Sequence, residues 1–340
     1  MQRTEILSTE TPALFDQAVE RAAEVLRRGE LVALPTETVY GLAANAFDAA
    51  AVRRIFEAKG RPAHNPIIVH VADRAMAQRC AAEWPALAER LATAFWPGPL
   101  TLVLPCGPEI PDVVTAGGGT VGLRWPGHPL MQAVIRACGF PLAAPSANRS
   151  NEISPTNAAH VARSLGGRIP LIIDGGQSQV GIESTVVDVS VTPPRLLRPG
   201  MIHEESLRAV TGALSSGAGK HDDTLRSPGM LRKHYAPKAK LVVLAWRDEA
   251  DFERQRAALS AQNGWPAERT FVLAHTHIPL GARVGSVNVI PHDAEAFARA
   301  LYGELHRADA EGAELILVEA LPDALEWRAV ADRLRRAAAE

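Results

Sequence analysis

The segment "SPGMLRKHYAP", residues 227–237, divides the chain into two α/β patterns. A small, polar, glycine-rich run, "GALSSGAGKHDDT" (212–224), precedes it, and "KAKLVVLAW" (238–246), which is typical of a first strand, follows it. A segment that only connects domains needs reach and solubility. This one carries two basic residues, a histidine, a tyrosine and two prolines, so the sequence predicts a role beyond spacing.

Residues 1–211 alternate short apolar runs with amphipathic windows. Runs typical of strands cover 30–35, 65–71, 100–106, 120–125, 140–145, 169–176, 184–190 and 194–200. Windows with helical periodicity cover 16–29, 49–60, 84–96, 129–139 and 156–167, and several end in glycine, as helices commonly do. The mixture predicts an α/β domain, although the order is too irregular to predict a doubly wound sheet.

The pattern starts again after the segment, so residues 240–340 predict a second, smaller domain, with 212–239 as the linker. We expect strands in 240–246, 269–275, 286–291 and 313–321, and helices near 249–261, 293–307 and 326–338. This order resembles a small parallel Rossmann-like unit. It contains neither GxGxxG nor a P-loop, so the fold alone predicts no nucleotide there.

Composition limits the classes of function. A chain of 340 residues exceeds the size at which one core usually keeps growing, which favours two domains. The formal net charge of −2 argues against a surface built mainly to bind nucleic acid. Cys80, Cys106 and Cys138 are widely spaced without a CxxC pair, which predicts reduced thiols in a cytoplasmic protein. The sequence shows no signal peptide and no apolar run of the roughly 20 residues that span a bilayer.

Polar side chains follow several predicted strands, at the edge of the sheet where α/β proteins bind ligands. In "LPTETVYGLA" (34–43), hydroxyl groups and the Glu37 carboxylate precede Gly41, where backbone can approach a ligand closely. A turn with capping hydroxyls explains the same residues. This run alone therefore leaves ligand binding and local structure as open alternatives.

The run "EAKGRPAHNPIIVH" (57–70) places Lys59 and Arg61 on either side of a glycine at the end of a predicted helix. Such a pair, stiffened by the prolines that follow, suits a polyphosphate, because arginine binds oxygens as a fork and lysine as a point charge. Cations that interact with the helix dipole are the structural alternative. His70, at the end of the next strand, is by itself more typical of a structural histidine.

Two further runs offer anion-binding groups. In "TVGLRWPGHP" (120–129), Arg124 ends a strand and suits a carboxylate, with a surface salt bridge as an equal alternative. In "AAPSANRSNEISPT" (143–156), Ser146, Asn148, Ser150 and Ser154 precede a helix start. Hydroxyl, amide and helix N-terminal groups together form an anion site, whereas a long capped loop explains only part of this density of donors.

The remaining polar runs are "DGGQSQVGIESTVVD" (174–188) and "LLRPG" (196–200), which ends a strand at Arg198. The sequence shows no spacing typical of a Ser/His/Asp triad, no HExxH motif and no carboxylate pair suited to glycoside hydrolysis. Cations, hydroxyls and backbone donors are groups that bind and position charged substrates. They do not indicate a nucleophile that attacks the substrate.

Taken in order, "PTETVYGL", "KGRP", "FWPGPLTLVL", "APSANRS", "ESTVVD" and "LRPG" resemble the YrdC/Sua5 family of threonylcarbamoyl-adenylate synthases. The linker and the Rossmann-like tail resemble the two-domain Sua5 form. The resemblance implies a YrdC-like twisted mixed sheet with a positively lined concave face. It also implies a nucleotidyltransferase that makes threonylcarbamoyl-AMP and pyrophosphate from L-threonine, bicarbonate and ATP, for the t6A modification of tRNA adenosine 37.

The resemblance also implies roles for individual residues. For ATP they are Lys59, Arg61, Asn65, Thr120, Ser146, Asn148, Ser154, Arg198 and Tyr235. For L-threonine they are Thr38, His70, Arg124, Ala144 and Ser184. Mg²⁺ is expected with ATP, bridging phosphate oxygens with few protein ligands. No catalytic residue is assigned. Small departures from the family pattern are Leu34, Ala43, Asn151 and Glu152.

The chemistry suggests a role for the linker, because the N-carboxy-threonine intermediate is short-lived in water and its site must exclude water. We hypothesise that residues 227–237 form a lid over the first domain, with Tyr235 near the substrates. Expected partners are the downstream threonylcarbamoyl-transferase machinery and, weakly, tRNA. The alternatives are a non-catalytic RNA-binding module with a basic concave face and a transferase that uses carbamoyl phosphate.

Overall fold

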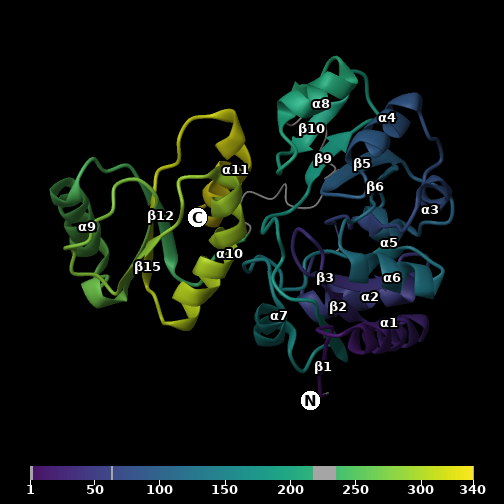
Figure 1. The fold of residues 1–340 in the computed structure, drawn as a ribbon, viewed down its shortest axis with the longest axis horizontal. Coiled ribbons are helices and arrows are strands. Elements are labelled where there is room, and N and C mark those ends of the chain that lie inside the picture. The colour runs from purple at the N-terminus through teal and green to yellow at the C-terminus, as the bar shows by residue number, and fades with distance from the viewer. Residues whose placement is uncertain (1–2, 63, 217–234, 340) are drawn as a thin grey trace. The chain divides into compact units, whose positions relative to one another are not determined.

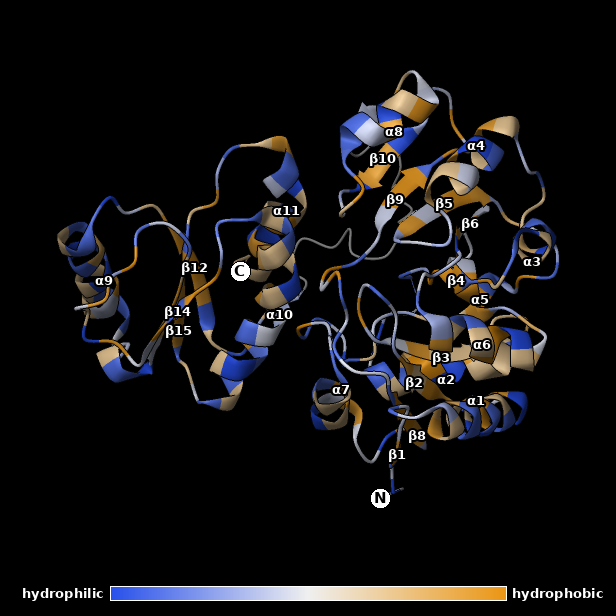
Figure 2. Ribbon diagram, viewed as in Figure 1, coloured by the Kyte–Doolittle hydropathy of each residue, from blue (hydrophilic) through white to orange (hydrophobic). Residues whose placement is uncertain are grey.

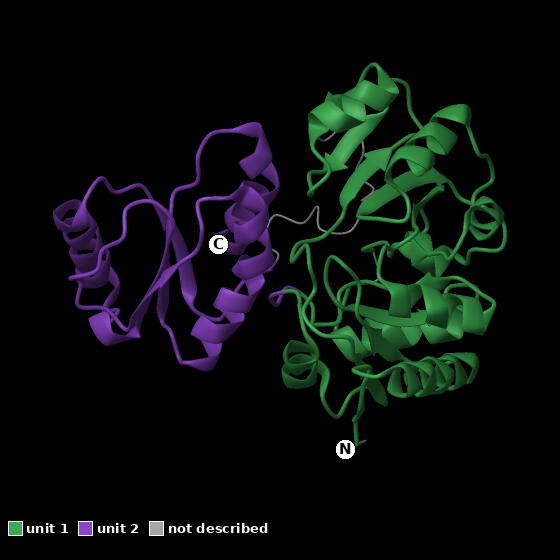
Figure 3. Cartoon of the chain, in the orientation of Figure 1, with its two compact units in different colours: residues 1–150, 154–230 green, residues 151–153, 231–340 purple. Residues whose placement is uncertain are grey.

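The structure is a computed structural model that describes residues 3–62, 64–216 and 235–339. The chain forms two compact units, one of residues 1–150 and 154–230 and the other of residues 151–153 and 231–340 (Figure 3). The prediction of a mixed α/β domain followed by a smaller parallel domain is confirmed (Figure 1). No helix within the described residues is long and apolar enough to cross a membrane.

Unit 1 is built on one mixed sheet with the strand order β1-β8-β2-β3-β7-β4-β6-β5-β9-β10-β11. The strands are β1 (Glu5–Ser8), β2 (Val32–Leu34), β3 (Gly41–Asn45), β4 (Val69–His70), β5 (Leu100–Pro105), β6 (Thr120–Arg124), β7 (Leu142–Ala143), β8 (Leu171–Asp174), β9 (Thr185–Asp188), β10 (Arg195–Arg198) and β11 (Ser215–Ser216). β4 runs parallel to β6, and β5 runs antiparallel to β6 and parallel to β9. The end of β6 therefore lies beside the start of β5, with the start of β9 next to it.

Helices pack against this sheet. They are α1 (Pro12–Arg27), α2 (Ala49–Lys59), α3 (Arg74–Cys80), α4 (Ala86–Phe95), α5 (Asp112–Thr115), α6 (Pro129–Cys138), α7 (Ala158–Leu165) and α8 (Glu204–Thr211). α2 shows why such helices begin and end where they do. The Asp48 side chain accepts hydrogen bonds from the first free N–H groups of the helix, and Gly60 ends it in the left-handed conformation. That ending turns the chain sharply just after Lys59.

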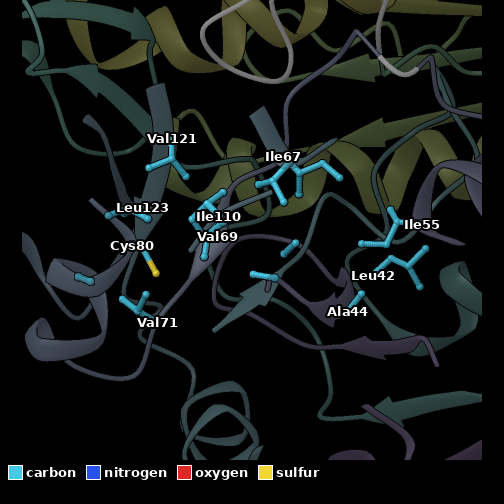
Figure 4. Close-up of a cluster of buried hydrophobic side chains, with 14 of the residues drawn as sticks. Leu42, Ala44, Ile55, Ile67, Val69, Val71, Cys80, Ile110, Val121 and Leu123 are labelled. Carbon is cyan, nitrogen blue, oxygen red and sulfur yellow. The ribbon is translucent and has the colours of Figure 1, made fainter. Parts of the chain in front are cut away.

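The core of unit 1 consists mainly of aliphatic side chains from neighbouring strands and from α2. Leu42, Ile55, Val69 and Leu123 belong to this cluster and are completely buried (Figure 4). The apolar residues lie along the strands, and the helices carry polar residues on their outer faces (Figure 2). A sheet buried in this way holds its strand ends in fixed positions, which is what a site built from loops requires.

Unit 2 contains a four-stranded sheet of order β12-β15-β13-β14, in which every paired strand is parallel. Its strands are β12 (Lys240–Leu244), β13 (Thr270–Ala274), β14 (Ser286–Val289) and β15 (Leu315–Glu319). Its helices are α9 (Glu249–Asn263), α10 (Ala294–Ala310) and α11 (Arg328–Ala337), with short 3₁₀ turns at Ala267–Arg269 and Leu325–Trp327. The predicted Rossmann-like order is confirmed.

Some local details differ from the sequence-based expectations. No strand was predicted within the polar run 36–43, but its last residues begin β3, which pairs antiparallel with β2. β1 and the helices α3, α5 and α8 were not predicted. The three cysteines are free, as expected. Of the predicted lid, residues 227–234 lie outside the described residues.

Candidate active site

A pocket in unit 1 is formed where several strands end. Its lining residues are Thr36, Thr38, Val39, Gly41, His70, Arg124, Ala144, Pro145, Ser146, Glu183, Ser184 and Arg198. His70 ends β4, Arg124 ends β6, and Ser184 immediately precedes β9. All five residues assigned to L-threonine therefore lie in one pocket, together with two of those assigned to ATP.

The Arg124 guanidinium is buried, with 4% of its surface exposed, and is held on three sides. Nη1 donates to Thr38 Oγ1 at 2.8 Å, and Nε donates to the Gly98 carbonyl oxygen at 3.4 Å. Nη2 lies 2.7 Å from Glu37 Oε1, close enough for an ion pair, but the two groups are not aligned as a hydrogen bond. The guanidinium is thus fixed in place and retains N–H capacity on the Nη2 side.

Glu37 supplies the negative charge behind this arginine. Burial acts to raise the pKa of Glu37, but the Arg124 charge and the backbone N–H of Gly127 outweigh it and hold the pKa below its ordinary value. The carboxylate is therefore ionised at neutral pH. Arg124, which lines the pocket, and Glu37 form a buried charge pair.

His70 is neutral in this pocket. Burial, assisted by the nearby Arg124 charge, lowers its pKa from 6.5 to about 3. Its Nδ1 atom is buried without a hydrogen-bond partner. Such an imidazole is too weak a base to deprotonate an ammonium group, but it can exchange one hydrogen bond with a ligand hydroxyl or amine.

Hydroxyl groups and Arg198 form another part of the lining. Ser184 Oγ lies 2.8 Å from Thr101 Oγ1 and accepts a hydrogen bond from Arg198 Nη2 at 3.1 Å. Arg198 Nε donates to the Ser184 carbonyl oxygen at 3.0 Å. Close by, Ser154 Oγ donates to Glu183 Oε1 at 2.6 Å. These contacts fix a row of short polar side chains in single rotamers before any ligand enters.

The cations of the run 57–70 are buried beside backbone oxygens. Lys59 Nζ donates to the carbonyl oxygens of Ser146 (2.6 Å) and Asn148. Arg61 donates to the carbonyl oxygens of Asn65 (3.3 Å) and Pro66 (2.9 Å). Lys59 thereby ties the end of α2 to the loop after β7, so the two runs that sequence analysis assigned to phosphate lie side by side.

Buried polar atoms that lack a hydrogen-bond partner are concentrated in this region. By hydrogen-bond geometry, three of the ten such atoms among the described residues belong to Asn65 and His70, and three more belong to the ion-paired side chains of Glu37 and Arg124. In Asn65 both the amide oxygen and the amide nitrogen are unsatisfied, although the residue is 1% exposed. Buried polar groups are almost always satisfied in folded proteins, so this concentration indicates a place that is completed by a ligand.

Other predicted site residues lie outside the pocket lining. Thr120 opens β6, and Arg124 closes it, which separates them by about 13 Å along the strand. Tyr235 belongs to unit 2, where its buried ring lies 5.8 Å from the Tyr302 ring and beneath the Arg333 guanidinium. Its backbone is left-handed, with φ of 64°. These placements leave the predicted nucleotide roles of Thr120 and Tyr235 as predictions.

Sequence analysis did not assign several residues of this site. They are Glu37, which pairs with Arg124, and the lining residues Thr36, Val39, Gly41, Pro145 and Glu183. Each lies within one of the polar runs described above. Its position in the sequence, close to the assigned residues, is the feature that could have indicated it. The described residues include no group of three or more histidine, cysteine or carboxylate side chains placed to hold a metal ion.

Comparison with known proteins gives the family. Residues 24–200 match a family model described as telomere recombination, whose label combines Sua5, YciO and YrdC. Residues 202–339 match the model of the threonylcarbamoyl-AMP synthase C-terminal domain. The chain belongs to the Sua5 family. This confirms the resemblance stated from the sequence.

Relatives of the Sua5 family match along nearly the whole chain. Threonylcarbamoyl-AMP synthase of Pyrococcus abyssi is 42% identical, over 93% of this chain and 92% of its own. The protein of the same name from Bacillus subtilis is 42% identical, over 98% of this chain and 95% of its own. The crystal structure of P. abyssi Sua5 complexed with L-threonine has a TM-score of 0.89 and 41% identity, and covers 98% of each chain.

Proposed function

We propose that this protein is an L-threonylcarbamoyladenylate synthase, a nucleotidyltransferase that forms threonylcarbamoyl-AMP and pyrophosphate from L-threonine, bicarbonate and ATP. The observation that carries the proposal is the convergence of Thr38, His70, Arg124, Ala144 and Ser184 on one pocket. The match to Sua5 proteins over both domains supports it. The product would supply the t6A modification of tRNA in the cytoplasm, through a downstream threonylcarbamoyl transferase.

Arg124 is the proposed partner of the threonine carboxylate. Its guanidinium is already held by Thr38 and Gly98, so little side-chain entropy is lost when a carboxylate binds to the remaining N–H groups. The neutral His70 ring and the Ser184 hydroxyl offer hydrogen bonds to the rest of the amino acid. A pocket lined in this way favours a small polar substrate over an apolar one.

The ATP phosphates are proposed to lie along the runs 57–70 and 143–156. Arg61, Lys59 and the unsatisfied amide of Asn65 provide positive charge and hydrogen bonds in that region. Ser146, Asn148 and Ser154 border it, and Arg198 lies in the pocket that the α-phosphate must share with threonine. Mg²⁺ bound to ATP would neutralise phosphate charge with few protein ligands. Thr120, which begins β6, is proposed to complete the nucleotide site of unit 1.

The proposed chemistry is mainly positioning. Bicarbonate loses hydroxide to give CO₂, and the neutral amine of threonine bonds to its carbon. The proton released from the nitrogen combines with that hydroxide to form water. A carbamate oxygen then attacks the α-phosphorus, and the bond from that phosphorus to pyrophosphate breaks. Arg124 orients the amino acid, and the cations of the run 57–70 stabilise charge on the leaving group. With a pKa of about 3, the His70 ring stays neutral and is too weak a base to accept a proton from the substrate, so no acid–base role is proposed for it.

Pyrophosphate release by the purified full-length protein tests the proposal, with products followed by mass because the adenylate is labile. We expect release to require ATP, bicarbonate and L-threonine together, and L-serine to be a poorer substrate. Arg124→Ala should raise the KM for threonine more than that for ATP, and Arg61→Ala the reverse. ATP turnover that is indifferent to threonine, or salt-sensitive RNA binding without turnover, would instead favour the RNA-binding alternative.

A further inference from the structure

The carboxyl edge of the unit 2 sheet carries a cluster of histidines that the proposed reaction does not use. Residues 275–277 follow β13, His292 follows β14, and Glu319 ends β15. Ligands of open parallel sheets bind at this edge, beyond the ends of the strands. The sequence of unit 2 contains none of the glycine-rich motifs that bind nucleotides. The side chains at this edge therefore indicate the kind of ligand that could bind there.

Three polar atoms of this cluster lie within hydrogen-bonding distance of one another. His275 Nδ1 and His292 Nδ1 are 2.9 Å apart. Thr276 Oγ1 lies 2.8 Å from each of these two nitrogens. The three atoms therefore form a nearly equilateral triangle, with His275 buried and both Thr276 and His292 exposed to solvent.

Hydrogen bonds account poorly for this triangle. His275 Nε2 lies 3.2 Å from the Ala320 carbonyl oxygen, a contact that requires the proton on Nε2 and leaves a lone pair on Nδ1. In a triangle with equal edges, a hydrogen that points along one edge lies about 60° away from the direction of the next edge. It therefore cannot form a hydrogen bond along both edges. At least one contact is therefore two electronegative atoms facing each other without a hydrogen between them.

The surrounding structure fixes the triangle. Glu319 accepts backbone hydrogen bonds from His275 at 2.7 Å, Thr276 at 2.8 Å and His277 at 3.0 Å, which holds the loop after β13 rigidly. The His275 ring packs 5.6 Å from the Trp327 ring. The contact from His275 Nε2 to a carbonyl is the outer-sphere hydrogen bond that orients metal-binding histidines.

We propose that His275 Nδ1, His292 Nδ1 and Thr276 Oγ1 bind a divalent first-row transition metal ion of octahedral preference, such as Ni²⁺, with water completing the coordination. Imidazole nitrogens select such metals over Mg²⁺. With metal–ligand bonds of about 2.0–2.1 Å, ligands at right angles lie about 2.8–3.0 Å apart, whereas tetrahedral ligands lie about 3.3–3.4 Å apart. The observed edges of 2.8 and 2.9 Å match one face of an octahedron.

The contact from His275 Nε2 to the Ala320 carbonyl oxygen leaves the lone pair of Nδ1 available to a metal ion. The bound ion would join the loop after β13 to the loop after β14. This function belongs to unit 2 and is separate from the Mg²⁺ expected with ATP.

Titration calorimetry of the full-length protein, free of affinity tags and of chelator, with NiCl₂ alone tests the site. We expect one equivalent of metal to bind, and His292→Ala to weaken binding at least about tenfold, since loss of an outer-sphere partner already costs 10–100-fold. Thr276→Val should weaken binding less. His277→Ala is the matched control, because this exposed histidine lies in the same loop and its Nδ1 pairs with Glu319 instead.

The outcomes separate the site from unspecific binding to surface histidines. Wild type and the His277→Ala variant should bind alike, and all variants should melt at the same temperature in EDTA. Absence of binding by the wild type would overturn the proposal, as would equal affinity of the His292→Ala variant. Pyrophosphate release with Mg²⁺ should be unchanged in His292→Ala, so failure of the proposed enzymatic function would leave this test intact.

Discussion

Replacing Arg124 by alanine would leave the Glu37 carboxylate buried without the charge that now lies 2.7 Å from it. Removing one partner of a buried ion pair typically costs about 3–5 kcal/mol, because the remaining charge loses its compensation. Neutralising Glu37 as well, in Glu37→Gln with Arg124→Ala, should recover a large part of this loss. The two single variants and the double variant form a cycle that isolates the interaction between the two side chains.

The cost should depend on pH in a defined direction. In the wild type the pKa of Glu37 is held below 4.5, so its contribution to stability is present above that value and is lost as the pH falls through the folded-state pKa. Without Arg124, burial remains the largest influence and raises the pKa. The variant then loses stability as the pH rises above 4.5, so the difference in stability from wild type should grow between pH 5 and pH 7.5.

Urea denaturation of the full-length proteins at these two pH values, followed by tryptophan fluorescence and circular dichroism together, measures the difference. The double variant is the control, because it contains no buried carboxylate at position 37. A loss of stability in Arg124→Ala that stays below about 1 kcal/mol, or that does not change with pH, would refute the assignment of a buried charge pair.

Three further predictions concern single residues. Gly200→Ala should destabilise unit 1 by about 1–3 kcal/mol or more in urea titrations, because an added Cβ would lie 2.4 Å from the Thr185 backbone nitrogen. His70 should show no titration between pH 5 and pH 8 by NMR, since its pKa of about 3 lies far below that range. Because the unfolded chain takes up this proton near its ordinary pKa of 6.5, the folded protein loses stability as the pH falls below 6.5. Lys59→Met should cost about 1–3 kcal/mol of unfolding free energy, because the Ser146 carbonyl oxygen would lose its donor.

Periodicity predicted most of the strands and helices, and the reason for the exceptions is physical. β3 has the sequence GLAAN, in which glycine and alanine carry little strand propensity and burial on both faces removes any alternation. Its strand character comes from pairing with β2 on one side and β7 on the other. Short helices such as α5, with four residues, offer too little periodicity to be recognised.

The site residues were predictable one at a time, but their contacts were not. Arg124 was recognised as a strand-end cation and Glu37 as a carboxylate in a polar run, yet 87 positions separate them. Their pairing depends on the hairpin that carries Glu37 and on the register of β6 beside β5. Lys59 shows the same limit, because its carbonyl partners belong to a loop nearly ninety residues further along. Such contacts follow from sheet order, which periodicity does not determine.

The electrostatics of the pocket explain how a site without a strong base can still favour one substrate. Arg124 and Glu37 together carry no net charge, so this pair by itself does not attract anions in general. In the proposed complex, an amino acid that pairs with Arg124 must also supply a hydrogen-bond partner for His70 Nδ1, which is buried without one. A ligand that lacks such a group would leave this atom unpaired, at a cost of about 1–3 kcal/mol. On the proposed function, selectivity for a hydroxyl-bearing amino acid would therefore follow from a polar atom that is unsatisfied and fixed before the ligand arrives.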